Sequence, residues 1–307
     1  MSRRRVLVGL AVLGQAWIGL TLGAAGAPAA TGTAALGAGG APASSSHSAA
    51  ANDPFASTAL GSWLAGRQGE ITAAVYDIET GQEYLLNPQD TEKTASTIKV
   101  DILATALHLA QLQHHPLPGD EAAAAVPMIT QSDNDAASDL YDDVGGWNAI
   151  GPFDTSIGMS HTTPNAQGYF GETYTTAADQ ITLLKQVMLP GGELSLASRQ
   201  YEYELMRHVI TGQRWGITGG VPADATVAIK NGWLPESSGW HVNSIGRVQG
   251  DGRDYLIAVY TSFDSSWAYG IDTIARIAAS AWQAMGVEQG AAAQHYGPSP
   301  PGKTTAG

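Results

Sequence analysis

The chain has 307 residues, of which 44% are hydrophobic, so it is long and apolar enough to bury a sizeable core. It contains no cysteine, which excludes disulfides, cysteine zinc sites, thiol nucleophiles and lipid attachment through cysteine. The formal net charge is −13, and without residues 1–53, which hold three arginines and one aspartate, it is −15. This charge argues against binding to nucleic acid or to an anionic membrane surface.

The N-terminus has the layout of a secretory signal peptide over residues 1–29. Arginines at positions 3–5 precede an apolar run over 6–22, and small residues follow at 27–29. A membrane anchor is the alternative, but glycines and Gln15 interrupt the run. We therefore expect export, with no stable membrane insertion after signal cleavage. The paired arginines leave both the Sec and the twin-arginine route open.

Composition divides the remainder into three parts. Residues 30–53 consist of small and polar residues that cannot bury enough surface to fold, so we expect a disordered linker. Residues 54–286 form the predicted folded domain, and the Gly-, Pro- and Ala-rich residues 287–307 form a disordered tail.

Hydrophobic periodicity predicts the elements of the domain in chain order. They are a helix over 55–66, strands over 71–78 and 83–87, helices over 96–110, 121–130, 136–143, 147–157, 176–188 and 194–210, strands over 226–230, 239–248 and 254–261, and a helix over 271–285. Two strands separated from three others by helices favour an α+β fold with one antiparallel sheet of about five strands. N- and C-terminal helices would flank this sheet, and the inserted helices would form a second lobe, with the active site in the cleft between them.

A serine opens the helix expected over 96–110, and a lysine follows three residues later. Ser96 and Lys99 share a helix face at this spacing, so the lysine could reach the serine hydroxyl. Desolvation favours a neutral lysine, which can serve as the base that makes a serine nucleophilic. The alternative is that Ser96 only caps its helix.

Two further short motifs complete a known trio. The chain contains Ser96-Thr97-Ile98-Lys99, Ser132-Asp133-Asn134 and Lys230-Asn231-Gly232, in this order. From about residue 54 to residue 286 it therefore resembles the class A β-lactamase-like serine hydrolases of the serine β-lactamase and penicillin-binding D,D-peptidase superfamily.

The resemblance implies a role for each of these residues. Ser96 would be the nucleophile and Lys99 the acylation base, while Ser132 would pass the proton to the leaving nitrogen. Lys230 would tune Ser132 and attract a substrate carboxylate, and Asn134 would hold Lys99 and the substrate amide. The backbone N–H groups of Ser96 and Trp233 would form the oxyanion hole, and Gly232 would keep the strand edge open.

The chain also departs from the family pattern. Asn231 replaces the usual threonine, although its amide could still donate a hydrogen bond to a substrate. The family's glutamate followed by Leu-Asn is missing from the long loop over 158–175, where Glu172 is the only carboxylate. Glu172 is thus a weak candidate for the base that activates the deacylating water, and a surface or capping role is the alternative.

The expected activity is acylation of Ser96 by a β-lactam or a related amide or ester, followed by hydrolysis. A D,D-peptidase or esterase acting on cell-wall substrates, or a weakly catalytic ligand-binding homologue, remains open. We expect a monomer whose partner is a small-molecule β-lactam or a cell-wall peptide. None of the eight histidines has the neighbours of a metal ligand, so no metal or cofactor is expected.

Overall fold

The structure, a computed structural model, describes residues 52–286 and contains one five-stranded antiparallel sheet. Its strands lie in the order β2-β1-β7-β6-β5. The bounds are β1 Glu70–Asp77, β2 Glu83–Leu86, β5 Thr226–Glu236, β6 Gly239–Gly250 and β7 Arg253–Asp264. The predicted α+β class and antiparallel sheet are confirmed. The expected signal peptide, the tail and nearly all of the linker lie outside the described residues.

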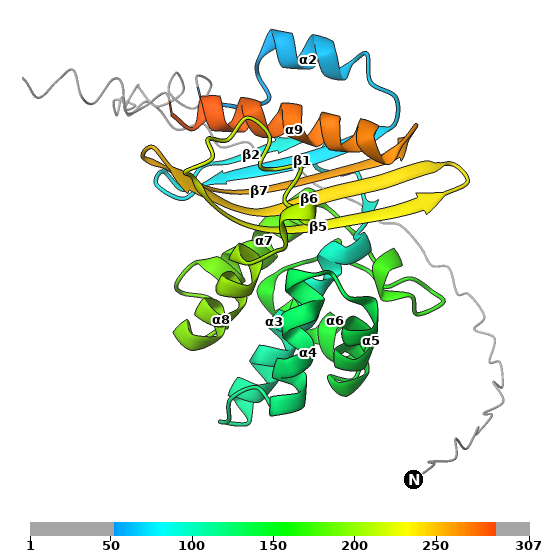
Figure 1. Ribbon diagram of the computed structural model, residues 1–307, viewed down its shortest axis with the longest axis vertical. Coiled ribbons are helices and arrows are strands. Elements are labelled where there is room, and N and C mark those ends of the chain that lie inside the picture. Colours follow the sequence, from blue (N-terminus) through cyan, green and yellow to red (C-terminus); the bar gives the residue numbers. More distant parts are fainter. Residues whose placement is uncertain (1–51, 287–307) are drawn as a thin grey trace, which may run out of the picture. The chain divides into compact units, whose positions relative to one another are not determined.

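Helices cover both faces of this sheet (Figure 1). The α9 and α2 helices lie on one side, and the inserted helices lie on the other. The bounds are α2 Thr58–Leu64, α3 Ile98–Leu112, α4 Gly119–Thr130, α5 Asn134–Asp143, α6 Trp147–Ile157, α7 Ala177–Met188, α8 Leu196–Arg207 and α9 Trp267–Ala284. No helix within residues 52–286 is long and apolar enough to cross a membrane.

Side-chain alternation along β5 divides the strand between two cores. Val227 and Ile229 are buried in the core shared with α9, whereas Ala228 is buried in the core shared with the inserted helices. Successive side chains of a strand point to opposite faces of its sheet. Lys230 and Gly232 therefore share the face of Ala228 that carries the inserted helices.

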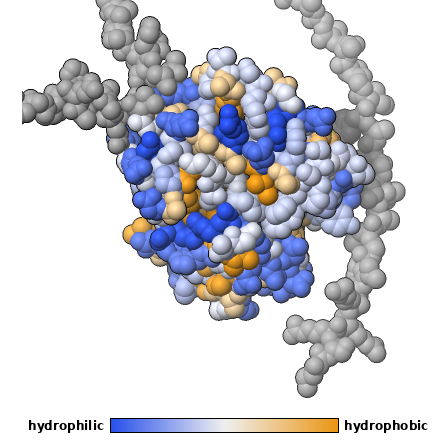
Figure 2. All heavy atoms as spheres, turned by 45° about the horizontal axis from the view of Figure 1, so that its top comes forward, coloured by the Kyte–Doolittle hydropathy of each residue, from blue (hydrophilic) through white to orange (hydrophobic). Residues whose placement is uncertain are grey.

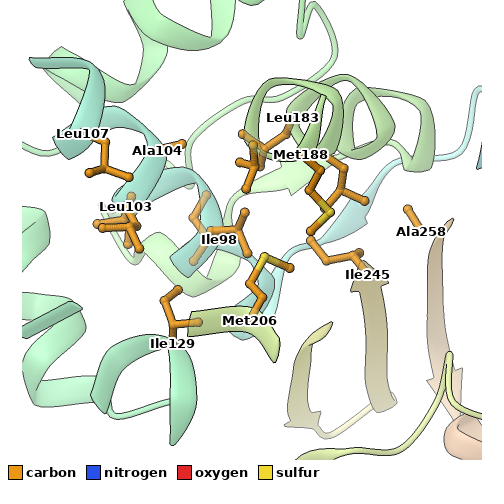
Figure 3. Close-up of a cluster of buried hydrophobic side chains, with 14 of the residues drawn as sticks. Ile98, Leu103, Ala104, Leu107, Ile129, Leu183, Met188, Met206, Ile245 and Ala258 are labelled. Atoms are coloured by element: carbon orange, nitrogen blue, oxygen red, sulfur yellow. The ribbon is translucent and has the colours of Figure 1, made fainter. Parts of the chain in front are cut away.

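The α3 helix is the centre of the inserted lobe. Nearly all of its length is buried, and Figure 3 shows Ile98, Leu103 and Leu107 of α3 within the hydrophobic cluster. The cluster extends to the sheet through Ile245 of β6 and Ala258 of β7. Because most residues of α3 are buried, among them the polar Lys99, Asp101 and Thr105, the residues at its N-terminus are rigidly placed.

The structure differs from the predicted elements mainly around α3. The chain over Ala95–Thr97 forms a separate 3-10 helix, η1, and α3 begins only at Ile98. A small two-stranded sheet, β3 Glu92–Lys93 and β4 Tyr174–Thr175, joins the stretch before η1 to the loop expected over 158–175. Two further 3-10 helices are η2, Phe170–Glu172, and η3, Thr211–Gln213. Local periodicity gives no signal for such short elements.

Candidate active site

Ser96 lies in η1, in a turn that is hydrogen-bonded to a strand of the sheet. The Nδ2 atom of Asn243 on β6 donates hydrogen bonds to the carbonyls of Lys93 and Thr94, at 2.8 and 3.0 Å. Ala95 has a φ of +45°, a left-handed conformation that costs an L-residue roughly 1–2 kcal/mol. This backbone is therefore kept in place by the surrounding contacts, and Ser96 is presented half-buried at its end.

Lys99, in the first turn of α3, is completely buried. Its Nζ atom donates to the carbonyl oxygen of Ser132 at 2.6 Å and to Oδ1 of Asn134 at 2.7 Å, and it lies 3.3 Å from Oγ of Ser132. Within the described residues, it forms no hydrogen bond with the Ser96 hydroxyl. Ser96 belongs to η1 and Lys99 to α3, which follows η1 directly in the chain.

The turn between α4 and α5 supplies Ser132 and Asn134. Ser132 has a φ of +59°, while Asp133 caps α5 by accepting a hydrogen bond from the N–H of Ala136 at 2.9 Å. Asn134 is the first residue of α5. The cap fixes where α5 begins, and this in turn fixes the Asn134 amide beside Lys99.

A second buried lysine reaches the same serine from the sheet. Lys230 on β5 donates to Oγ of Ser132 at 2.9 Å and to the carbonyl of Asn231 at 2.7 Å. Ser132 therefore contacts lysine side chains from α3 and from β5. The structure thus brings together Lys99, Ser132, Asn134 and Lys230 from three separate parts of the chain.

Burial changes the acid–base chemistry of both lysines. Desolvation lowers the pKa of Lys99 to about 8, against a smaller opposing effect of the Asp133 carboxylate. Desolvation also holds the pKa of Lys230 well below its usual range, and the nearby charge of Lys99 adds to this. A lysine with a lowered pKa can accept a proton near neutral pH.

Gly232 lets β5 approach the turn that carries Ser96 closely. A Cβ atom at this position would lie 2.8 Å from the backbone nitrogen of Ser96 and 2.9 Å from the carbonyl oxygen of Thr94. The strand is the last one of the sheet, with no further strand beside it among the described residues. The absence of a side chain at Gly232 is therefore what allows the backbones of β5 and η1 to meet.

The side chains of Asn231 and Trp233 lie on the other face of β5, and the Asn231 amide bonds within the protein. Both hydrogens of the Asn231 amide are used within the protein, in bonds to the carbonyls of Gln213 at 2.8 Å and Trp215 at 3.0 Å. Trp233 stacks with Trp215 and Trp267, with ring centroids 5.9 and 6.4 Å from its own. Neither Asn231 nor Trp233 shares the face of Lys230, because strand residues alternate.

Glu172, at the end of η2, lies near the turn that carries Ser96, and its carboxylate bonds to other side chains. Its Oε2 atom lies 3.3 Å from Nζ of Lys93 and accepts a hydrogen bond from the amide of Asn165, also at 3.3 Å. Lys93 also forms an ion pair with Glu236. The Glu172 carboxylate is thus partnered by a cation at the end of β3.

Two polar residues near the site were not found from the sequence. Asn243 supports the turn that carries Ser96, and Gln213 donates through Nε2 to the carbonyl of Gln131, beside Ser132. Asn243 lies completely buried within β6, and a buried amide needs a hydrogen-bond partner. An asparagine in the middle of a predicted strand was the available signal. Gln213 lies in a loop, where the sequence pattern gives no signal for it.

The turn that carries Ser96, the inserted helical lobe and the lysine-bearing edge strand together give the chain the fold and arrangement of the class A β-lactamase type. The comparisons with known proteins agree. A model of the β-lactamase enzyme family matches residues 122–285, and the chain belongs to this family. The resemblance inferred from the motifs is confirmed.

Solved structures share the fold at low sequence identity. The TLA-1 extended-spectrum β-lactamase is 21% identical, with a TM-score of 0.67 over 75% of this chain and 97% of that chain. A PBP-A variant, solved as an acyl-enzyme complex with penicillin G, is 20% identical, with a TM-score of 0.64 over 73% and 93%.

A curated relative in Mycobacterium tuberculosis is described as "Putative lipoprotein LppW". It is 29% identical over 199 residues. The match spans 62% of this chain and 62% of the length of that relative.

Proposed function

We propose that the protein is a serine hydrolase that β-lactams, or related amides and esters, acylate on Ser96. The observation that carries this proposal is the position of Ser132, whose hydroxyl lies near Nζ of Lys99 and 2.9 Å from Nζ of Lys230. Two buried lysines around one serine hydroxyl form a route for a proton that a purely structural turn does not need.

The proposed reaction begins with proton removal from Ser96. Neutral Lys99 takes this proton as the Ser96 oxygen attacks the carbonyl carbon, and the backbone N–H groups of Ser96 and Trp233 receive the developing oxyanion. As the carbon–nitrogen bond breaks, Ser132 transfers a proton to the leaving nitrogen and takes one from the protonated Lys99, which becomes neutral again. Lys230 stabilises Ser132 during the transfer. Water finally attacks the ester on Ser96 and releases the acid.

The acylation step has more support than the hydrolysis of the acyl-enzyme. Acylation uses residues that the fold brings together, whereas the candidate base for hydrolysis, Glu172, is engaged by Lys93. We therefore propose that the acyl-enzyme forms readily and is hydrolysed slowly. A D,D-peptidase or an esterase would use the same acylation machinery, so these activities remain the second candidate.

Export is part of the proposal and rests on the signal-like layout of residues 1–29. The name of the mycobacterial relative also refers to a lipoprotein. Since this chain has no cysteine, a lipid attached through cysteine is not available to it.

The test is incubation of the purified protein with benzylpenicillin, followed by intact mass spectrometry and by an assay of turnover. A persistent adduct that is absent from the Ser96→Ala variant would support the proposal. Rapid turnover without an accumulating adduct would contradict slow hydrolysis and indicate an efficient β-lactamase. Neither adduct nor turnover would reject β-lactam acylation and favour an esterase or a binding protein.

A further inference from the structure

The loop over residues 210–217 is fastened to the sheet by two side chains on neighbouring strands. Asn231 of β5 and Ser244 of β6 are paired in the sheet register and share a face. Asn231 donates to the carbonyls of Gln213 and Trp215, while the Ser244 hydroxyl accepts a hydrogen bond from the N–H of Ile217 at 3.1 Å. This end of the loop is therefore fixed at two adjacent points.

The fit between the loop and the sheet is tight. Gly216 has a φ of +80°, and a Cβ atom there would lie 2.7 Å from Oγ of Ser244. A side chain at Gly216 would force the loop away from the strand, so the loop has little freedom to shift.

The other end of the same loop is fastened to the turn that carries Ser132. The N–H of Ile210 donates to the carbonyl of Thr130 at 2.9 Å, and Nε2 of Gln213 donates to the carbonyl of Gln131 at 2.8 Å. These two carbonyls belong to the residues immediately before Ser132. The loop therefore connects Asn231 on the sheet with the backbone of the Ser132 turn.

Ser132 needs such support, because its left-handed backbone is costly for an L-residue. Its carbonyl and hydroxyl oxygens also contact Lys99, and the hydroxyl contacts Lys230. A small displacement of the turn would lengthen the contacts with both lysines. Misplacement by about 1 Å can cost a catalytic step on the order of a hundredfold.

We propose that Asn231 is a positioning residue that holds Ser132 in place through the 210–217 loop and does not bind the substrate. This inference rests on the proposed function of the same site. It gives a reason for an asparagine where the family usually has a threonine, because a threonine hydroxyl has one hydrogen to donate and the loop presents two carbonyls.

The kinetic test compares benzylpenicillin, which carries a carboxylate, with its neutral methyl ester. In the Asn231→Ala and Asn231→Thr variants we expect the acylation rate constant to fall at least tenfold, equally for both compounds, with their dissociation constants unchanged within about twofold. A loss confined to the dissociation constant of the carboxylate compound would mean that Asn231 binds substrate, and it would overturn the inference.

Further variants separate positioning from a general loss of stability. Gln213→Ala, at the other end of the connection, should reproduce the defect, and in a Ser132→Ala background Asn231→Ala should add none. The matched control is Asn87→Ala, because the Asn87 amide also donates to a backbone carbonyl, that of Ile71, but far from the site. Asn87→Ala should keep the acylation rate constant within twofold of that of the parent protein. An equal loss in this control, or an additive loss with Ser132→Ala, would contradict the inference.

Hydrogen–deuterium exchange tests the connection without any β-lactam. In Asn231→Ala we expect amide exchange in the segment 130–135 to rise at least tenfold, with no change in α9. Unchanged exchange in this segment would overturn the inference, whether or not the parent protein is acylated. Faster exchange in a parent that no β-lactam acylates would instead leave the connection standing and reject the proposed function.

Discussion

The Nζ atom of Lys230 lies 2.9 Å from the Oγ atom of Ser132. One residue comes from the edge strand of the sheet and the other from a turn in the helical lobe, so this contact joins the two halves of the site. Lys230 is completely buried and lies near a second buried lysine. Two buried ammonium groups so close together repel each other, which favours a neutral lysine and hence a base.

The pH dependence of acylation follows from the lowered pKa of Lys99. The reaction needs the neutral amine, so we expect the acylation rate to rise with pH and to level off above about 8. Stopped-flow measurement with a chromogenic cephalosporin between pH 5.5 and 9.5 would record this rise. The Lys99→Met variant should lose roughly 100- to 10,000-fold in rate. A flat profile in the parent would show that Lys99 is not the titrating base.

Substitution of Gly232 tests the contact between β5 and η1. In Gly232→Ala the new methyl group meets the backbone of Ser96 and Thr94, neither of which can yield easily. We expect acylation to fall on the order of a hundredfold. The control is Gly61→Ala in α2, where a Cβ atom would have no neighbour within 4 Å. This change should leave the rate unaltered and stabilise the helix by about 0.5–1 kcal/mol.

Glu172→Gln tests whether the carboxylate takes part in hydrolysis. Because Lys93 and Asn165 already hold this carboxylate, we expect the lifetime of the acyl-enzyme to change less than about threefold. The measurement is the decay of the Ser96 adduct, followed by mass spectrometry after removal of excess penicillin. A lifetime longer by two orders of magnitude would instead identify Glu172 as the base.

A buried carboxyl pair in the helical lobe predicts how stability depends on pH. Burial raises the pKa of Asp101, on α3, to about 7. Burial and the charge of Asp101 raise the pKa of Asp154, on α6, to about 10. The neighbouring carboxyls of Glu202 on α8 and Asp179 on α7 raise the pKa of Asp101 and of Asp154, respectively, further. Burial also raises the pKa of Glu202 itself well above its usual range, and Tyr260 of β7 lies near Asp101. Both carboxyls therefore keep their protons more firmly in the folded state than in the unfolded chain.

The sign of the effect follows from proton binding. Between pH 4, where unfolded aspartates ionise, and the raised folded pKa values, the folded state holds more protons, so stability falls as pH rises. One retained proton corresponds to about 1.4 kcal/mol per pH unit. The Asp154→Asn variant has no carboxyl group to ionise at this position, so its free energy of unfolding should fall less steeply as pH rises. Urea unfolding at pH 5.5, 7.0 and 8.5 would measure it, and parallel curves for parent and variant would contradict the assignment.

The sequence was sufficient for the fold and for the family, because both leave local patterns. Apolar spacing predicted the order of strands and helices, and the three motifs located Ser96, Ser132 and Lys230. The resemblance to the family also anticipated the contacts of Lys99 with Asn134 and of Lys230 with Ser132. The support that Asn243 and the 210–217 loop give to the site was not predicted. Where a side chain finds its partner depends on residues far along the chain, which periodicity does not encode.

The direction of the Asn231 side chain illustrates the same limit. The strand was expected to end near Lys230, but β5 continues to Glu236, so ordinary alternation turns Asn231 toward the 210–217 loop. The longer strand is set by its pairing with β6, residue by residue from Thr226 to Glu236. Hydrogen bonding between the strands thus decides which face a residue occupies.

The strand order also has a consequence for synthesis on the ribosome. The β1 strand pairs with β7, the last strand among the described residues, so this sheet is complete only once residue 264 has been translated. A nascent chain that ends before β5 contains Ser96 and Lys99 but lacks the strand that brings Lys230 to Ser132. Chains truncated before residue 226 should therefore be inert toward acylating agents.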